Sequence, residues 1–310
     1  MVDSGCKSEF AKLLQVDRTC LYRNWNKQQE KDESSINELQ KAHIINPRYG
    51  VRRLAIVLAW SEDKTRRIRN LAGVEALRKS KKRYKTSTLK EIDAPENKLK
   101  AFWEYKNPEK PWLGYNFSRL TDPTLNIWTQ DFTYISWHGK FLYFAVTFRI
   151  ASREVLGWSF GFYHDADLVT ASLEDALRNN DAPNITHTDQ GSEYLSQKNF
   201  ELCKNIGTVM SASDPGQPWQ NGFMERFFNT FKEEMEEKLK RCKTSFEVYE
   251  RIANWVYYYN YERIHTSLKM SPKDYAARLQ KNNLSSNVLQ GVPEMNASHS
   301  LRLPSHSVAV

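Results

Sequence analysis

The chain has 310 residues, of which 40% are hydrophobic and 13% aromatic. That composition excludes a wholly disordered chain, and the length allows two domains with separate cores. No apolar run approaches the ~20 residues that cross a bilayer, and the N-terminus lacks the apolar stretch of a signal peptide. We therefore expect an intracellular protein without a membrane anchor.

The net charge of +8 is distributed unevenly along the chain. Residues 1–100 carry 23 Lys and Arg against 13 Asp and Glu, whereas residues 101–310 carry 22 against 24. This asymmetry predicts a basic nucleic-acid-binding region followed by a near-neutral domain. The four cysteines lack the paired spacing of a zinc site, so we expect free thiols.

Residues 1–78 are expected to be helical. Residues 8–23 read as two short helices around a tight turn, a helix-turn-helix pattern that exposes Arg18 and Arg23. Ser35 and Glu38 form a capping box that predicts a helix running to about Ile45. Further helices are expected over residues 51–58 and 64–72, the second capped by Ser61 or Asp63. Four arginines of these helices are predicted to contact DNA, with a solvated basic face as the alternative: Arg52, Arg53, Arg66 and Arg67.

Residues 79–120 are expected to be a linker. Its first part, residues 79–90, is basic and nearly free of aliphatic side chains, so Lys81, Lys82 and Arg83 are predicted to lie on the phosphate backbone. The prolines of residues 91–123 predict an irregular connector.

Residues 121–280 read as one α/β domain. Alternating apolar residues predict three antiparallel strands over residues 126–136, 141–150 and 154–163. Strands and helices then alternate, which predicts a mixed sheet covered by helices. The expected elements are helices over 165–178, 197–205, 219–239 and 246–264, short strands ending at 188 and 211, and a last helix to about 279. Residues 281–310 are expected to be a disordered tail.

Three acids stand out in this domain. Asp131 lies within the first strand, Asp189 follows a short β-branched run, and Glu225 has helical spacing with Phe223, Phe227 and Phe228. Carboxylates held on two strands and a helix suit two divalent cations about 3.5–4 Å apart that carry out phosphoryl transfer. Each acid taken alone would be read as a surface residue or a helix cap.

Four segments, in this order, carry a resemblance to a known family: NIWTQDFTYI at residues 126–135, HTDQGS at 187–192, GQPWQNGFMERF at 216–227 and YNYERIH at 259–265. With 35 residues between Asp189 and Glu225, they resemble the DDE transposases of the IS3-type insertion sequences, which have a retroviral-integrase-like core. PRYGVRR at residues 47–53 is a weaker match.

The resemblance implies an RNase H-like fold and a catalytic, metal-binding triad of Asp131, Asp189 and Glu225. It implies two Mg²⁺ ions, for which Mn²⁺ would substitute, and hydrolysis of a phosphodiester followed by strand transfer. Double-stranded DNA at the element's terminal repeats and at the target would be the substrate. We also expect a homo-oligomer on DNA, a bacterial cytoplasmic location at the nucleoid, and an upstream DNA-binding partner or fusion in some arrangements of the gene.

Asn221, at the start of the Glu225 helix, is expected to orient that turn or a DNA phosphate. Arg263 and His265, at the end of the aromatic-rich helix, are expected near the DNA, although His265 taken alone would be read as a structural histidine. Glu193, Gln220 and Arg226 depart from the commonest IS3-type pattern, but none of the three replaces a metal ligand. Two other readings remain open. A simple RNase H-type nuclease would not need the basic N-terminal region, and a non-catalytic DNA-binding derivative would not need the triad.

Overall fold

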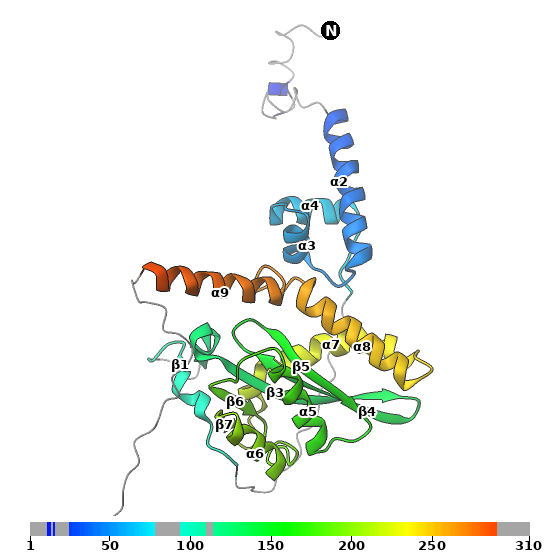
Figure 1. Cartoon of the computed structure of the whole chain (residues 1–310). Coiled ribbons are helices and arrows are strands. Elements are labelled where there is room, and N and C mark those ends of the chain that lie inside the picture. Colours follow the sequence, from blue (N-terminus) through cyan, green and yellow to red (C-terminus); the bar gives the residue numbers. More distant parts are fainter. Residues whose placement is uncertain (1–10, 14, 16–24, 78–93, 110–113, 290–310) are drawn as a thin grey trace, which may run out of the picture.

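The computed structural model describes residues 11–13, 15, 25–77, 94–109 and 114–289. Figure 1 shows a helical unit standing on an α/β core, with α8 and α9 on the side of the core that faces this unit. The helical unit consists of α2 (Trp25–Ile45), α3 (Val51–Val57) and α4 (Glu62–Leu71). No helix in the described part of the chain is long and apolar enough to span a membrane.

The helical unit confirms two predicted helices and corrects one. Ser61 caps α4 by accepting a hydrogen bond from the amide of Lys64 at 3.2 Å, and α3 covers nearly the predicted range. The helix predicted to begin at Ser35 instead begins at Trp25, so Ser35 and Glu38 lie inside α2. The preceding Lys, Gln and Glu residues favour a helix, and this propensity outweighs the local capping signal. The predicted helix-turn-helix of residues 8–23 lies almost wholly outside the described residues.

The segment predicted as an irregular linker contains short regular elements in its described residues, 94–109 and 114–125. It forms η2 (Lys98–Phe102), the two-stranded ribbon of β1 (Glu104–Tyr105) and β2 (Tyr115–Asn116), η4 (Ser118–Thr121) and η5 (Pro123–Leu125). Leu99 and Leu120 are buried against Ile127 and Ile150 of the core. Residues 94–109 and 114–120 therefore belong to the core domain, because their apolar side chains complete its packing.

The core is built on a five-stranded sheet with strand order β5-β4-β3-β6-β7. Its strands are β3 (Ile127–Trp137), β4 (Lys140–Arg149), β5 (Glu154–Gly161), β6 (Ile185–Thr188) and β7 (Val209–Ala212). The first three strands are antiparallel neighbours, whereas β3, β6 and β7 run parallel. His138 and Gly139 join β3 to β4 with φ of 44° and 75°, as a tight hairpin turn requires. The predicted mixed, RNase H-like sheet is confirmed.

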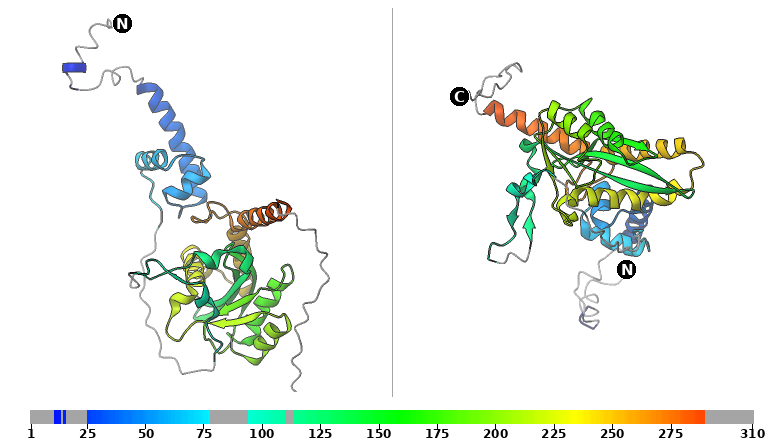
Figure 2. Two further views of the ribbon diagram at one scale, coloured as in Figure 1. Left: turned by 90° about the vertical axis from the view of Figure 1, so that its left-hand side faces the viewer. Right: turned by 90° about the horizontal axis from the view of Figure 1, so that it is seen from below.

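Helices cover both faces of the sheet (Figure 2). On one face, α7 (Gly222–Lys240) and α8 (Ser245–Tyr261) pack on alternate residues of β4, among them Phe144 and Phe148. On the other face lie α5 (Ala166–Leu177) and α6 (Gln197–Asn205). Because side chains alternate along a strand, β4 supplies apolar residues to both layers.

Gly157 on β5 explains how closely α5 approaches the sheet. A Cβ at this position would lie 2.2 Å from the amide nitrogen of Ala176 and 2.4 Å from the carbonyl oxygen of Ser172. Both are backbone atoms of α5 that cannot rotate away, so only glycine fits here.

The last helix, α9 (Pro272–Leu289), continues ten residues beyond its predicted end, so the start of the predicted tail is helical. Residues 290–310 lie outside the described residues. Cys203 and Cys242 are buried free thiols, as predicted.

The helical unit touches the core at the end of α8. Tyr258 donates a hydrogen bond to Asn46 at 2.8 Å, the hydroxyl of Tyr49 accepts one from the amide of Ile264 at 2.9 Å, and Arg53 donates to Thr266 at 3.1 Å. This seam places α3 and α4 next to α7.

Candidate active site

Asp131 and Asp189 lie side by side at the centre of the sheet. Thr129 of β3 pairs with His187 of the parallel strand β6, so Asp131, two residues on, is level with Asp189, which follows the end of β6. Neighbouring strands are about 4.8 Å apart, and side chains at the same level point to the same face. The register therefore brings the first two predicted acids together.

Burial and mutual repulsion dominate the electrostatics of this pair. Burial raises the pKa of Asp131 well above its usual value, and the nearby Asp189 carboxylate raises it further. The backbone amide of Phe132, at 2.8 Å, and the charge of Lys232 oppose this shift. Two buried like charges favour a cation between them, or a proton on one of them.

The loop after β6 holds Asp189 in place. The amide of Gly191 donates a hydrogen bond to Oδ1 of Asp189 at 2.9 Å. A Cβ on Gly191 would lie 3.0 Å from the same oxygen and 2.8 Å from Oε2 of Glu193, so glycine allows this close approach. Burial raises the pKa of Asp189, the Gly191 amide opposes the rise, and Glu193 adds to it.

Glu225 reaches the site from a different element. It lies exposed in the first turn of α7, and the start of that helix is fixed to β3 by Asn221. The hydroxyl of Thr129 donates to Oδ1 of Asn221 at 2.7 Å, and Nδ2 of Asn221 approaches the carbonyl of Gln130 at 3.4 Å. This joins the Glu225 helix to the two residues before Asp131.

The three predicted acids do not form a closed metal cluster. Among the described residues, no group of three or more His, Cys, Asp or Glu side chains is close enough to hold one metal ion. Asp131 and Asp189 are adjacent, whereas Glu225 lines the groove beside α7. The carboxylates remain suitable ligands for Mg²⁺, which keeps several waters and needs few protein oxygens.

Sequence reasoning missed an ion pair beside the acids. Nδ1 of His164 lies 2.6 Å from Oε1 of Glu193, and the His164 ring stacks on Phe132 with centroids 5.8 Å apart. Glu193 was noted only as a departure from the family pattern. His164 lies outside every motif, so no signal in the sequence linked the two residues.

Comparison with known proteins adds an independent line of argument. Two models of the family described as "Integrase core domain" match residues 124–218 and 207–272. The transposase of insertion sequence IS904 from Lactococcus lactis is 29% identical over 267 residues, which are 82% of this chain and 98% of that protein. Transposase InsF of IS3A from Escherichia coli is 34% identical over 109 residues, 34% of this chain and 38% of InsF. The chain is thus similar to insertion-sequence transposases, and its residues 124–272 match the integrase core domain.

Another relative matches the chain over about half of its own length. The transposase of IS629 from Shigella sonnei is 28% identical, with 51% of this chain matched to 55% of that one. Among solved structures, the catalytic core domain of HTLV-2 integrase is similar at 18% identity and a TM-score of 0.42, covering 49% of this chain and 95% of that one.

Two residues that are predicted to contact DNA also have partners inside the chain. Asn221 is only 7% exposed, and its amide is engaged with β3. Arg263 is 4% exposed and pairs with Glu234 at 2.9 Å. Both side chains have partners within the chain, and Arg263 also lines the groove beside α7. Their contacts with DNA remain predictions. His265 is half-buried among arginines, and burial together with these charges lowers its pKa to about 3.

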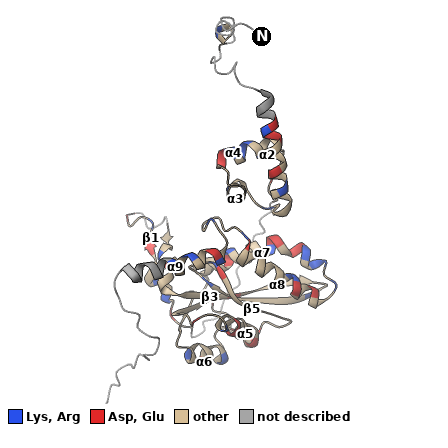
Figure 3. Cartoon of the chain, turned by 45° about the horizontal axis from the view of Figure 1, so that its top comes forward, with Lys and Arg blue, Asp and Glu red and all other residues tan. Residues whose placement is uncertain are grey.

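The four arginines predicted on the N-terminal helices all have partners within the chain. Arg67 makes a two-pronged contact with Asp32 at 2.6 and 2.8 Å, and Arg66 contacts Asp63 at 2.8 Å. Arg52 lies 3.8 Å from Glu62, and Arg53 contacts Thr266. Figure 3 shows that basic and acidic residues are mixed along α2 and α4. Arg18, Arg23, Lys81, Lys82 and Arg83 lie outside the described residues.

A groove of about 1340 Å³ separates the helical unit from α7. One wall carries basic residues of α3, α4 and the preceding turn, and the other carries Glu225 and Arg226 of α7. The basic residues of the first wall are Arg48, Arg52, Arg53, Arg66 and Arg69. The groove therefore joins the predicted DNA-contact region to the third predicted acid.

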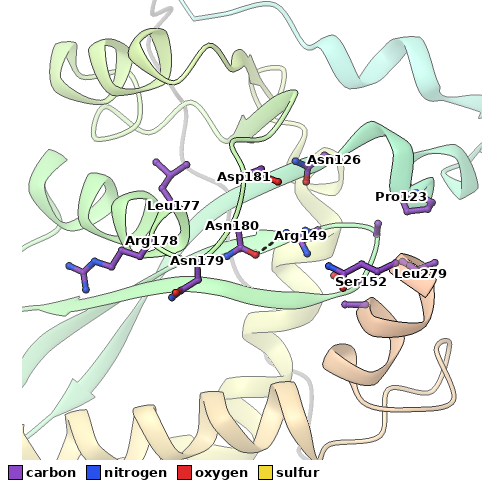
Figure 4. A pocket seen from close by; sticks show the side chains of 13 residues that line it. Pro123, Asn126, Arg149, Ser152, Leu177, Arg178, Asn179, Asn180, Asp181 and Leu279 are labelled. Atoms are coloured by element: carbon purple, nitrogen blue, oxygen red, sulfur yellow. Dashed lines mark hydrogen bonds between the residues drawn. The ribbon is translucent and has the colours of Figure 1, made fainter. Parts of the chain in front are cut away.

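A second pocket, of about 530 Å³, contains none of the three acids. It lies where β3 begins and β4 ends, and its central side chain is Arg149 (Figure 4). Arg149 donates to Asn180 at 3.0 Å and pairs with Glu154 at 3.1 Å. Internal partners thus occupy both terminal nitrogens of this guanidinium, whereas its buried Nε has no hydrogen-bond partner among the described residues.

Proposed function

We propose that the chain is the transposase of a bacterial insertion sequence, which cleaves DNA at the ends of its element and joins the freed end to a target. Asp131, Asp189 and Glu225 are its catalytic and metal-binding residues in this proposal. The observation that carries it is the Asp131–Asp189 pair, two half-buried carboxylates at the centre of an integrase-type sheet.

The acids and their supports have separate tasks. The amides of Phe132 and Gly191 orient Asp131 and Asp189, and Asn221 holds the Glu225 helix against β3. Two Mg²⁺ ions bound by these carboxylates would activate an attacking oxygen and stabilise the leaving oxygen, and Mn²⁺ would substitute. The raised pKa values of both aspartates support this choice, because a cation relieves their repulsion.

The DNA is proposed to follow the groove between α7 and the basic helices. Arg52, Arg53, Arg66 and Arg67 would exchange part of their internal pairing for phosphate contacts, as surface ion pairs contribute little stability. Arg18, Arg23, Lys81, Lys82, Arg83 and His265 stay in the proposed DNA contact set. We expect residues 1–90 to bind DNA with a strong dependence on salt.

Two ends must be joined, yet the chain carries one set of acids. We therefore infer at least two copies on paired ends, related by a two-fold axis. The linker at residues 79–90 would let the N-terminal region of one copy hold the DNA that the other copy cuts. A DNA-binding partner or fusion upstream of the chain is a further part of this proposal.

The decisive experiment incubates the full chain with labelled DNA taken from the flanks of its gene, with Mg²⁺, with Mn²⁺ and with EDTA. We expect a nicked end and a strand-transfer product with either metal ion, neither product in EDTA, and neither with Asp131→Asn. Cleavage without any joined product would favour the RNase H-type nuclease. Binding without cleavage by the wild-type chain would favour the non-catalytic derivative.

A further inference from the structure

Five aromatic rings gather on the surface where the β1–β2 ribbon meets the start of α7. They come from three segments of the chain and are Trp103, Tyr105, Tyr115, Phe117 and Trp219. Figure 2 shows the ribbon projecting from the body of the core. Tyr105 and Tyr115 stack with centroids 4.8 Å apart, and Tyr115 lies nearly parallel to Trp219, at 9° and 5.9 Å. We call these five residues the aromatic platform.

The platform keeps much of its ring surface in water. Tyr105 is 47% and Trp219 is 40% exposed, whereas the rings that pack α7 on the sheet, such as Phe231, are almost fully buried. Exposing large aromatic surfaces is unfavourable, and the ring area left open on the platform is one on which a planar ligand can stack.

A pocket of about 590 Å³ opens on the platform. Its walls include Trp103, Tyr115 and Trp219 together with Lys100 and Asp214. The indole N–H of Trp103 is buried and has no hydrogen-bond partner among the described residues. Because this N–H is buried, the part of the pocket open to a ligand is the ring surface itself, which suits a flat heterocycle.

The platform is continuous with the proposed active site. Trp219 lies in η6 (Pro218–Asn221), the turn that leads directly into α7. Trp219 also lines the large groove that contains Glu225. One side chain therefore borders both the aromatic pocket and the proposed path of the DNA backbone.

We propose that the aromatic platform binds an unpaired nucleobase of the DNA next to the cleavage position. The inference rests on the proposed function, since it takes the groove as the DNA path. The base would stack against the ring surface that Trp219 and Tyr105 expose in this pocket. Taking a base out of a duplex costs least at a frayed end or a mismatch, so the platform favours ends that are already open.

A peptide is a poorer fit to this surface than a base. The parallel rings of Tyr115 and Trp219 present flat faces, and Lys100 and Asp214 pair with each other at 2.7 Å on the pocket wall. A stacked base suits the flat rings through its π-face and suits the polar pocket wall through its edges.

The test uses the full chain, in EDTA, with a short duplex that ends in a two-nucleotide single-stranded extension carrying 2-aminopurine. Binding should quench the fluorescence of the probe. Trp219→Ala and Tyr105→Ala should each remove most of the quenching and weaken binding roughly 5- to 100-fold, the range expected for one stacked base. Trp219→Phe should restore most of the quenching.

Tyr257→Ala is the matched control, because Tyr257 forms an exposed stacked pair with Tyr261 on α8, with centroids 4.7 Å apart. It should leave quenching unchanged. Tyr105 lies on the ribbon rather than before α7, so its variant keeps the test valid if Trp219→Ala fails to fold by circular dichroism. Wild-type quenching in a folded Tyr105→Ala chain would overturn the proposal.

Two other outcomes would also overturn it. Light scattering that shows Tyr105→Ala converting a dimer into a monomer, with quenching unchanged, would assign the platform to a second copy of the chain. Equal effects of Tyr257→Ala and Tyr105→Ala would mean that no specific stacking site exists. Quenching is measured in EDTA and does not depend on catalysis. If the chain proved unable to cut DNA but its quenching still depended on Trp219, the proposed reaction would be refuted and the base-binding site would stand.

Discussion

The acid pair of the sheet and the arginines of the N-terminal helices hold their charges in opposite ways. Asp131 and Asp189 lie together, half-buried, and each has a raised pKa. Arg66 and Arg67 lie on the surface, each against a carboxylate of its own unit. Two like charges that are held together lower the stability of the fold, which indicates a site for a bound cation. Ion pairs on the surface keep the helical unit soluble, and their arginines can exchange the carboxylate partner for a phosphate.

Asp131→Asn, Asp189→Asn and Glu225→Gln give the largest expected effect. Each change keeps the shape of the side chain and removes a ligand charge, so we expect cleavage to fall by at least roughly 1000-fold, as loss of metal-based charge stabilisation implies. DNA affinity should change less than about twofold in a gel-shift assay. Strand transfer by any of the three variants would remove that residue from the site.

Arg263→Ala sharpens the comparison between buried and exposed arginines. It leaves Glu234 as an unpaired charge 13% exposed, and breaking such a buried pair costs about 3–5 kcal/mol. Urea unfolding measures the loss, with the exposed Arg241→Ala as control. If Arg263→Ala were as stable as the control, the structural role assigned here would be wrong.

Asn221→Ala tests whether Asn221 holds the helix that carries Glu225 in place. It leaves the hydroxyl of Thr129 without its buried acceptor, which costs about 1–3 kcal/mol. Because the helix carrying Glu225 is then released from β3, cleavage should fall up to about 100-fold, the effect of a small misplacement. Asn254→Ala, an exposed change on α8, should alter neither stability nor cleavage.

The acid pair also predicts a dependence on pH. Since the folded pKa values of Asp131 and Asp189 lie above the unfolded value of about 3.9, their contribution to stability is complete below about pH 3.9. It is lost as the pH rises through the folded values. In EDTA, the free energy of unfolding of Asp131→Asn minus that of the wild type should therefore grow with pH. Mg²⁺ should shrink this difference, and a difference that is flat with pH would contradict the raised pKa values.

Arg52→Ala has the smallest expected effect on folding. Its contact with Glu62 is long and both side chains are exposed, so stability should change by less than about 1 kcal/mol. If it contacts a phosphate, affinity should fall for all DNA sequences and the salt slope should decrease by about 1. An unchanged slope would leave Arg52 as a purely solvated charge.

The sheet was predicted well from the sequence because apolar and polar residues alternate clearly along its long strands. The bounds of α6 and the hairpin at His138 and Gly139 were predicted from sequence, and the register alone brings Asp131 next to Asp189. The ribbon at residues 104–116 escaped prediction, since two-residue strands carry no periodicity. Packing of Trp103 against Trp219, distant in sequence, orders it instead.

Site roles were harder to predict than elements. The motifs containing Asn221 and Arg263 were found, but whether such a side chain faces DNA or the interior depends on partners far away in the chain. Thr129 and Glu234 are those partners, and nothing near either motif identifies them.

The close approach of α5 to β5 limits which mutations a copy of the gene can tolerate. Every single-nucleotide change that replaces Gly157 adds at least one carbon, and backbone atoms of Ala176 and Ser172 already fill that space. Overpacking of this kind commonly costs about 1–3 kcal/mol. A single missense change at Gly157 can thus lower the stability of the protein while the motifs that contain Asp131, Asp189 and Glu225 remain unchanged.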